Sequence, residues 1–232
     1  MTDVREFETY LYIRNDKFKI FLLDTSNLNN IYSNELILDN NSRINFEELS
    51  RFLDNNIFKI EKLLGKFIED ILLIIDDDVE LQTIISIKKR NNNLPEKKIL
   101  NQALIDSKDL FKENNEDKDI IHMIIENFMI DGKDCNFLSE NLKSDYLNLD
   151  VKFITLPNKY IFKFNKLLEN YQIKVKQFVS GKYLNSFLYK EDVEISVMAH
   201  KIINGHNINE ITIVPKNTPN KGFFEKFFQL FS

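Results

Sequence analysis

The order of the apolar runs in the first third of the chain is the feature that most restricts its fold. Three short runs rich in β-branched and aromatic residues come first, separated by polar turn residues, over 10–13, 18–23 and 31–38. A longer stretch, 46–64, then repeats its apolar residues at helical spacing, and Gly65 stands where a helix C-cap belongs. The run 71–75 is continuously apolar, which indicates a strand buried on both faces. The order predicted is therefore strand, strand, strand, helix, strand.

The rest of the chain continues as strands and helices in alternation. Proline at 95 and at 157 marks the first turn of two predicted helices, and Gly181 precedes a short third one. The segment 193–203 reads as a further helix. Strands are predicted over 81–87, 120–130, 151–155 and 173–179, with an edge strand over 208–214. The fold class predicted is α/β (α+β).

Composition narrows the class of function. The 232 residues include 31 Lys and Arg against 36 Asp and Glu, a formal charge of −5, so there is no basic surplus for nucleic acid. No run of about 18 apolar residues occurs to span a bilayer, and the charged first ten residues do not read as a secretory signal. The single cysteine, Cys135, excludes an intrachain disulfide and is expected to be an inert thiol in a reducing compartment. We expect a cytoplasmic protein.

The chain is poor in glycine, which bears directly on nucleotide binding. A phosphate-binding loop needs glycines where backbone N–H groups approach the ligand closely. The chain has 5 glycines, all far apart in sequence: Gly65, Gly132, Gly181, Gly205 and Gly222. No nucleophile motif or dinucleotide fingerprint is present either. We therefore expect no enzyme activity, no catalytic residues and no bound cofactor.

Few residues offer metal or acid–base chemistry. The run 76–78 is three aspartates after a buried strand, where carboxylates can bind a metal, but a solvated turn explains it better. His122 lies within an apolar strand pattern and is expected to be a hydrogen-bonded core residue. His200 and His206 have no cysteine or paired carboxylate at ligand spacing, so no zinc site is expected.

The C-terminal segment 222–232 has the strongest amphipathic pattern in the chain. On a helix its apolar side chains fall within an arc of about 160°. They are Phe223, Phe224, Phe227, Phe228, Leu230 and Phe231. A polar linker over 215–221 precedes it and brings lysines suited to anionic lipid. We expect a membrane-binding helix, too short for firm attachment unless the protein self-associates; the alternatives are docking on the protein's own core or in a partner's groove.

The order of elements from 10 to 188 resembles the N-terminal half of FtsA, the actin-like bacterial protein that tethers the division ring to the membrane. The segment 121–132 reads IHMIIENFMIDG and is similar to the family pattern His-x-Ile-Pro-Gln-x-Phe/Tyr-x-Ile-Asp. The segments 149–155, 165–168 and 173–179 also resemble the family's strand, long helix and following strand. The pilus-assembly protein PilM shares this architecture, but the terminal amphipathic helix favours the division protein.

The resemblance implies a partial actin-like, ribonuclease-H-like subdomain joined to a strand–helix–strand–strand subdomain of FtsA type. The implied divisions are 1–78 for the first subdomain, 79–180 for the second, 181–214 for a return segment, 215–221 for the linker and 222–232 for the membrane-targeting helix.

The sequence departs from the family at the nucleotide site. FtsA opens with Asp-Ile-Gly-Thr/Ser, the first phosphate loop, whereas this chain has Tyr12 for the aspartate and Arg14 for the glycine, followed by Asn15. No second phosphate loop follows Leu188, and the remaining residues leave no room for the second actin-like half. The resemblance thus implies a shortened FtsA with a degenerate ATP site. Direct contact with FtsZ is not expected, because the family makes that contact in the missing half.

These patterns predict a division scaffold on the inner face of the bacterial plasma membrane. Its partners would be cell-division proteins and further copies of itself, with no metal and no cofactor. Two alternatives stay open. One is a PilM-like adaptor of a secretion or pilus system; the other is a ligand-binding protein or enzyme in which Tyr12 and Arg14 contact a ligand directly.

Overall fold

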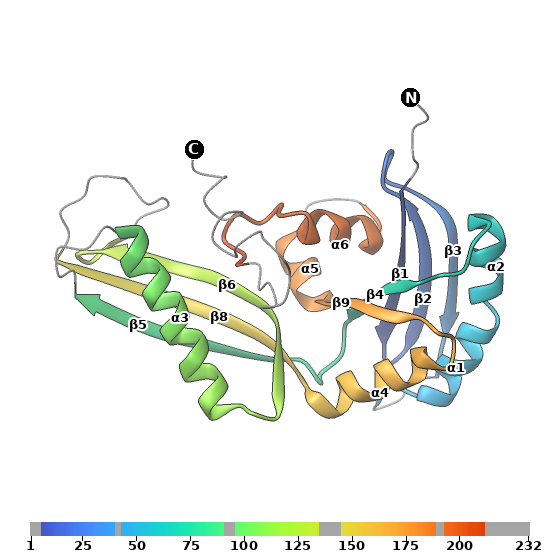
Figure 1. Cartoon of the computed structure of the whole chain (residues 1–232), viewed down its shortest axis with the longest axis horizontal. Helices are drawn as coiled ribbons and strands as arrows, with labels where there is room; N and C mark the ends of the chain where they lie inside the picture. Colours follow the sequence, from blue (N-terminus) through green and yellow to red (C-terminus); the bar gives the residue numbers. More distant parts are fainter. Residues whose placement is uncertain (1–5, 40–42, 91–95, 135–144, 189–192, 212–232) are drawn as a thin grey trace. The chain divides into compact units, whose positions relative to one another are not determined.

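The computed structural model describes residues 6–39, 43–90, 96–134, 145–188 and 193–211, and the chain divides into two compact units (Figure 1). Unit 1 contains residues 1–80 and 156–206, and unit 2 contains residues 81–155 and 207–232. The chain therefore leaves unit 1 after Glu80 and returns to it at Leu156.

Unit 1 is built on a five-stranded mixed sheet. Its strands are β1 (Phe7–Arg14), β2 (Lys17–Asp24), β3 (Asn29–Ile37), β4 (Asp70–Ile75) and β9 (Lys174–Ser180). Their order is β3-β2-β1-β4-β9. The first three pair antiparallel as a meander, whereas β4 pairs parallel with both β1 and β9. This is the strand order of the ribonuclease-H-like fold, and the predicted α/β class is confirmed.

The register shows which helices cover which face of this sheet. Phe18 is opposite Ile13 and its ring lies 6.1 Å from that of Phe52 in α1 (Phe46–Asp54). Side chains at even positions of β1 point to the other face, where Glu8 contacts His200 of α6 (Ile195–Ile203). Helices thus cover both faces, and the five residues of β4 from Ile71 are at most 1% exposed.

The stretch predicted as one helix, 46–64, is two helices in the structure. Asn45 caps the first, α1, and α2 (Ile57–Leu64) follows after Asn55 and Asn56. The amide of Asn56 is fully buried: it donates to the Phe52 carbonyl at 2.6 Å and accepts from the Tyr32 hydroxyl of β3 at 2.6 Å. An asparagine side chain that bonds the backbone in this way competes with the helix, which explains the break. Gly65 ends α2 with a φ of 69°, as predicted.

Unit 2 is a second sheet covered by one long helix. Its strands are β5 (Leu81–Arg90), β6 (Lys118–Ile130), β7 (Lys133–Asp134) and β8 (Tyr146–Pro157), in the order β5-β8-β6-β7. The helix is α3 (Glu96–Asn114). Phe111 of α3 stacks on Phe153 of β8 with ring centroids 4.9 Å apart, and both rings are buried. The core of this unit lies between the helix and the sheet.

The division between the units differs from the predicted subdomain 79–180. Both α4 (Asn158–Glu169) and β9 belong to unit 1, because β9 completes the first sheet by pairing with β4. The short helix α5 (Gly181–Phe187) and α6 also belong to unit 1.

The predicted edge strand 208–214 is, over its described residues, only a short contact with β6. Ile125 N donates to the Asn209 carbonyl at 2.9 Å and Ile211 N to the Met123 carbonyl at 2.7 Å, around a single bridge between Ile124 and Glu210. Residues 212–214, the linker 215–221 and the amphipathic segment 222–232 lie outside the described residues.

Candidate functional site

The first candidate site is the edge of the unit 1 sheet at which β1, β4 and β9 end. These strands are parallel, and the register places Ile13 opposite Ile75 and Ile75 opposite Ser180. Arg14, Asp76 and Gly181, the residues that come next, therefore meet at one edge. Open α/β sheets usually bind their ligands beyond the carboxyl ends of such strands. We call this region the strand-end cluster: 12–17, 76–80 and 180–182.

The Tyr12 side chain links the end of β1 to the residue that follows β4. Its hydroxyl donates to Asp76 Oδ2 at 2.6 Å, and Asp76 N donates to the Ile13 carbonyl at 2.9 Å. The side chain is buried, and burial together with the neighbouring Asp76 carboxylate raises the pKa of the phenol. At neutral pH Tyr12, which stands where the FtsA resemblance predicts an aspartate, is thus a neutral hydrogen-bond donor, and its proton is already bonded to Asp76.

Arg14 and Asn15 lie at the turn between β1 and β2. The Arg14 guanidinium donates through two N–H groups to the Asp16 carboxylate, and this bond holds the pKa of Asp16 below its usual range. Both side chains are more than a third exposed, so the pair contributes little to stability. Lys17 lies over the Tyr12 ring at 5.8 Å. Tyr12 and Arg14 thus lie near the end of β1, and Asn15 follows in the turn. The charge of Arg14 is paired to the Asp16 carboxylate.

Two carboxyl groups of the strand-end cluster are buried. The Ser180 hydroxyl donates to Glu80 Oε2 at 2.5 Å, and burial raises the pKa of Glu80 to about 8. Val79 N donates to Asp77 Oδ1 at 3.1 Å, and burial also raises the pKa of Asp77. The second oxygens, Asp77 Oδ2 and Glu80 Oε1, have no hydrogen-bond partner among the described residues. Glu80 is therefore largely protonated at neutral pH.

The glycine of the strand-end cluster, Gly181, allows α5 to pack closely against the end of β4. A Cβ added at Gly181 would lie 2.5 Å from the Asp76 Cβ and 3.1 Å from the Asp76 Cα, so only glycine lets α5 begin so close to the end of β4. The next residue, Lys182, donates to Asp78 Oδ1 at 2.7 Å and lowers the pKa of that exposed carboxyl.

The chemistry of the strand-end cluster opposes phosphate binding. Phosphate oxygens need hydrogen-bond donors and positive charge, and here the cations have no surplus over the carboxyl groups, even with Glu80 largely protonated. The carboxyl groups belong to Asp16, Asp76, Asp77, Asp78 and Glu80, and the cations to Arg14, Lys17 and Lys182. Within the part of the chain that the structure describes, no three His, Cys, Asp or Glu side chains are grouped to hold a metal ion.

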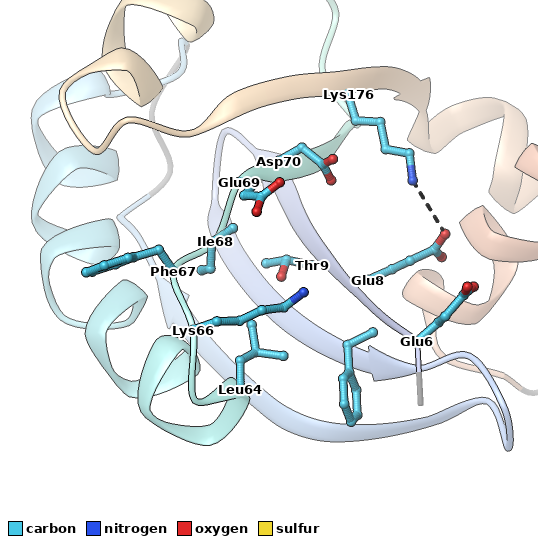
Figure 2. Close-up of a pocket in the computed structure, with 11 residues that line it drawn as sticks. Glu6, Glu8, Thr9, Leu64, Lys66, Phe67, Ile68, Glu69, Asp70 and Lys176 are labelled. Atoms are coloured by element: carbon cyan, nitrogen blue, oxygen red, sulfur yellow. Dashed lines mark ion pairs between the residues drawn. The ribbon is translucent and has the colours of Figure 1, made fainter. Parts of the chain in front are cut away.

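A cavity of about 510 Å³ lies at the opposite end of the same sheet, beside the first residues of β1 and β4 (Figure 2). Glu8 is its most connected side chain: it accepts from the Tyr10 hydroxyl at 2.5 Å, lies 2.7 Å from His200 Nδ1 and pairs with Lys176 Nζ at 3.9 Å. Glu6, Glu69 and Asp70 add carboxylates and Lys66 an ammonium group. We call this space the acidic cavity.

None of the motifs in the sequence predicted the acidic cavity, although the pattern of β1 carries a signal for part of it. Glu8, Tyr10 and Tyr12 occupy alternate positions along β1, so their side chains share one face of a central strand. Polar groups at such positions must find partners when the strand is buried. Their partners, His200 and Asp76, are far away in sequence and carry no such signal.

The remaining sequence candidates are not among the residues that form these two regions. The His122 side chain is fully buried in unit 2 with Nδ1 2.6 Å from Glu210 Oε1, while His206 lies edge-on to the Phe187 ring in unit 1. Cys135 and the six apolar residues at 223–231 lie outside the described residues. None of the described helices is long and apolar enough to cross a membrane.

The strand order and the residues at its carboxyl edge define an α/β protein of the ribonuclease-H-like class. No protein-family model matches the chain, and no curated protein matches it. Among solved structures, the chain is similar to the PilM–PilN type IV pilus biogenesis complex, with 11% identity, a TM-score of 0.46, and coverage of 80% of this chain and 50% of that one.

Two further structures match with lower TM-scores. The cytoplasmic domain of EpsL, an inner-membrane component of the type II secretion system of Vibrio cholerae, has 12% identity and a TM-score of 0.38, over 75% of this chain and 57% of that one. A Bacteroides thetaiotaomicron protein with an actin-like ATPase fold and unknown function has 17% identity and a TM-score of 0.31, over 82% and 60%. The chain thus spans roughly half to three fifths of these structures. The fold class rests on the observed sheet order, and the FtsA resemblance stays a prediction.

Proposed function

We propose that this chain is a non-enzymatic scaffold that rests on the cytoplasmic face of the bacterial inner membrane and recruits cell-division proteins. The observation that supports the proposal is the hydrogen bond from Tyr12 to Asp76, which engages both side chains at the sheet edge where ligands of open α/β folds usually bind. In this proposal the body of the protein serves to present surfaces to partners.

Electrostatics supports the absence of a nucleotide function. Two like charges 4 Å apart repel by about 4 kcal/mol at the effective dielectric near a protein surface. A triphosphate at the strand-end cluster would approach Asp76 and Asp78, and it would have to take Arg14 from Asp16 and Lys182 from Asp78. The ligand-binding alternative, in which Tyr12 and Arg14 hold a ligand, requires the same bonds to break.

Membrane attachment rests on the sequence of the segment 222–232. Its six apolar side chains predict a helix that binds the interface weakly, so several copies held together would be needed for firm binding. Self-association of the α/β body would supply that avidity. The division machinery is proposed from the FtsA resemblance, with a secretion or pilus adaptor as the alternative.

Calorimetry with Mg²⁺-ATP tests the non-enzymatic part. The expected result is no heat of binding and no rise in the melting temperature, because a ligand that binds only the folded state would stabilise it. A micromolar dissociation constant would overturn the closed-site interpretation and favour the ligand-binding alternative.

Co-sedimentation with anionic vesicles tests the membrane part. The unmodified chain should pellet, and a Phe227→Asp, Phe228→Asp variant should stay in solution. If the unmodified chain stays in solution at every concentration, the membrane part of the proposal is wrong.

Imaging of a fluorescent fusion in dividing bacteria separates the two kinds of machinery. Recruitment to midcell supports the division scaffold. Foci that follow secretion or pilus complexes, without midcell recruitment, would favour the adaptor.

A further inference from the structure

The outer surface of α2 combines exposed aromatic and basic side chains. Phe58 is 72% exposed, Leu63 is 56% exposed, and Phe67, just after the helix, is 81% exposed. Large apolar side chains with so much exposure are unusual within one short segment. Lys59 and Lys62 lie between them in sequence and are also exposed. We call Phe58, Lys59, Lys62, Leu63 and Phe67 the α2 patch.

Helix geometry gathers these residues on one side. At 100° per residue, Phe58, Lys62, Lys59 and Leu63 fall in that order within an arc of about 140°. Ile57 and Ile60, on the other side of α2, are buried in the unit 1 core. Phe58 and Leu63 are about 7.5 Å apart along the helix axis, with the lysines between them. Four residues of the α2 patch therefore share one outward face of the helix, with the two lysines between Phe58 and Leu63, and Phe67 follows shortly after the helix ends.

The segment 57–67 is itself basic. Glu61, the one acidic residue from Ile57 to Phe67, is half-buried and accepts a hydrogen bond from Ile68 N at 3.2 Å. Figure 2 shows the next lysine, Lys66, extending into the acidic cavity, whereas the ring of Phe67 points away from it. On a chain with a formal charge of −5, this face is locally basic.

We propose that the α2 patch is a second membrane contact, which binds anionic phospholipid headgroups. Its lysines would pair with the headgroup phosphates, and their alkyl stems would cover apolar surface. Phe58, Leu63 and Phe67 would enter the boundary between headgroups and acyl chains, the depth at which interfacial helices bury their apolar face. Charge complementarity selects this occupant, since the patch is basic and such a membrane surface is acidic.

The inference rests on the proposed membrane association and deepens it. A single short amphipathic helix binds membranes weakly, and a second contact in the same chain makes the binding of the first effectively intramolecular. With two contacts, unit 1 is held against the bilayer by α2 instead of only being tethered to it.

The neighbouring helix α4 offers a matched control. It also bears an exposed phenylalanine, Phe162 at 65%, between Lys159 and Lys163. These two lysines already lie over aromatic rings: Lys159 is 5.4 Å from the centroid of Tyr160, and Lys163 is 5.5 Å from that of Phe46. A double charge reversal on α4 therefore changes the net charge by the same amount as one on α2 without touching the patch.

The test is co-sedimentation of the full chain with phosphatidylcholine vesicles that do or do not contain phosphatidylglycerol. A lysine at an anionic surface contributes about fivefold to the partition coefficient. Lys59→Glu, Lys62→Glu should therefore weaken binding to the anionic vesicles by about 20-fold or more, and Lys159→Glu, Lys163→Glu by about twofold. Phe58→Ser, Phe67→Ser should weaken binding to a similar degree with charge unchanged. Thermal unfolding checks that each variant keeps its fold.

The outcomes separate this inference from the proposed function. If the α2 variants bind as the unmodified chain does while Phe227→Asp, Phe228→Asp does not bind, the α2 contact is wrong and membrane association stands. Equal losses from the α2 and α4 charge reversals would show an effect of net charge alone and overturn the patch. Retained vesicle binding with loss of an acidic protein partner would assign the patch to that protein instead. If the unmodified chain binds neither vesicle, both proposals fail.

Discussion

The two ends of the unit 1 sheet differ in how they treat their charged groups. At the carboxyl ends of the strands, Tyr12 is bonded to Asp76, and Glu80 is buried beneath Ser180. At the amino ends, Glu6, Glu69 and Asp70 border an open acidic cavity of about 510 Å³. Ligand binding in this fold class belongs at the carboxyl ends. The strand order alone therefore does not determine how charged groups are arranged at each end of the sheet.

The largest expected effect comes from Glu80, a buried acid at the carboxyl ends of the strands. Its pKa is about 8 in the folded protein and near 4.5 when unfolded, so between those values the unfolded state releases a proton that the folded state keeps. The free energy of unfolding should therefore fall as pH rises from 5 to 8, by about 1.4 kcal/mol per pH unit and by about 4 kcal/mol in all. Glu80→Gln should remove this slope.

Urea unfolding of both proteins at several pH values measures the effect. The histidines titrate in the same range, so the relevant quantity is the difference between the unmodified protein and Glu80→Gln. If the difference in unfolding free energy between the two proteins does not change with pH, Glu80 is ionised in the folded protein and water reaches it.

The second effect concerns the close packing of Gly181 against Asp76 at the carboxyl ends of the strands. Gly181→Ala places a Cβ 2.5 Å from the Asp76 Cβ, and relief of that clash requires backbone movement. We expect a loss of about 2–3 kcal/mol in unfolding free energy, at the upper end of the range for overpacking. Lys182→Ala, one residue further and exposed, is the control and should cost less than 1 kcal/mol. Equal small losses would contradict the close packing.

A smaller effect is expected from the hydrogen bond between Tyr12 and Asp76. Tyr12→Phe removes one hydrogen bond to a carboxylate, which contributes about 1.5 kcal/mol. The variant should still bind no Mg²⁺-ATP in calorimetry, because Asp76 and its neighbouring carboxylates remain. Acquired ATP binding would show that the phenol alone excludes the nucleotide, and the electrostatic argument would then fall.

The smallest change in unfolding free energy is expected at the acidic cavity. Lys176 lies 3.9 Å from Glu8 and is half exposed, so Lys176→Ala should change the unfolding free energy by less than about 0.5 kcal/mol. His200→Ala removes a shorter contact with the same carboxylate and should cost more. If Lys176→Ala costs as much as Tyr12→Phe, the two ends do not differ as described.

The sequence predicted the elements better than the connections between them. Apolar periodicity located the strands of unit 1 and the helices, since both depend on short-range patterns. The break at Asn56 was missed because apolar periodicity does not report the bond of the Asn56 side chain to the Phe52 carbonyl, nor the bond from Tyr32, on another element, that the same amide accepts. The membership of β9 in unit 1 was missed for the same reason: β4 pairs with a strand about a hundred residues later, and periodicity does not report pairing.

The candidate site was predictable only in part. Tyr12 and Arg14 stand out because the FtsA resemblance predicts an acidic residue and a glycine at these positions, but nothing in sequence links Tyr12 to Asp76. The buried state of Glu80 also depends on Ser180, a hundred residues away. Pairing at such separations is a property of the folded chain.

The late arrival of β9 has a consequence during synthesis. Ribosomes add about 5–20 residues per second, and β4 is made roughly a hundred residues before its parallel partner β9. For about 5 to 20 seconds the nascent chain therefore carries an apolar strand with one unpaired edge, while unit 2 emerges from the exit tunnel. Such an edge readily pairs with other chains. A chaperone that binds the segment from Ile71 to Ile75 during translation would protect it until β9 closes the sheet.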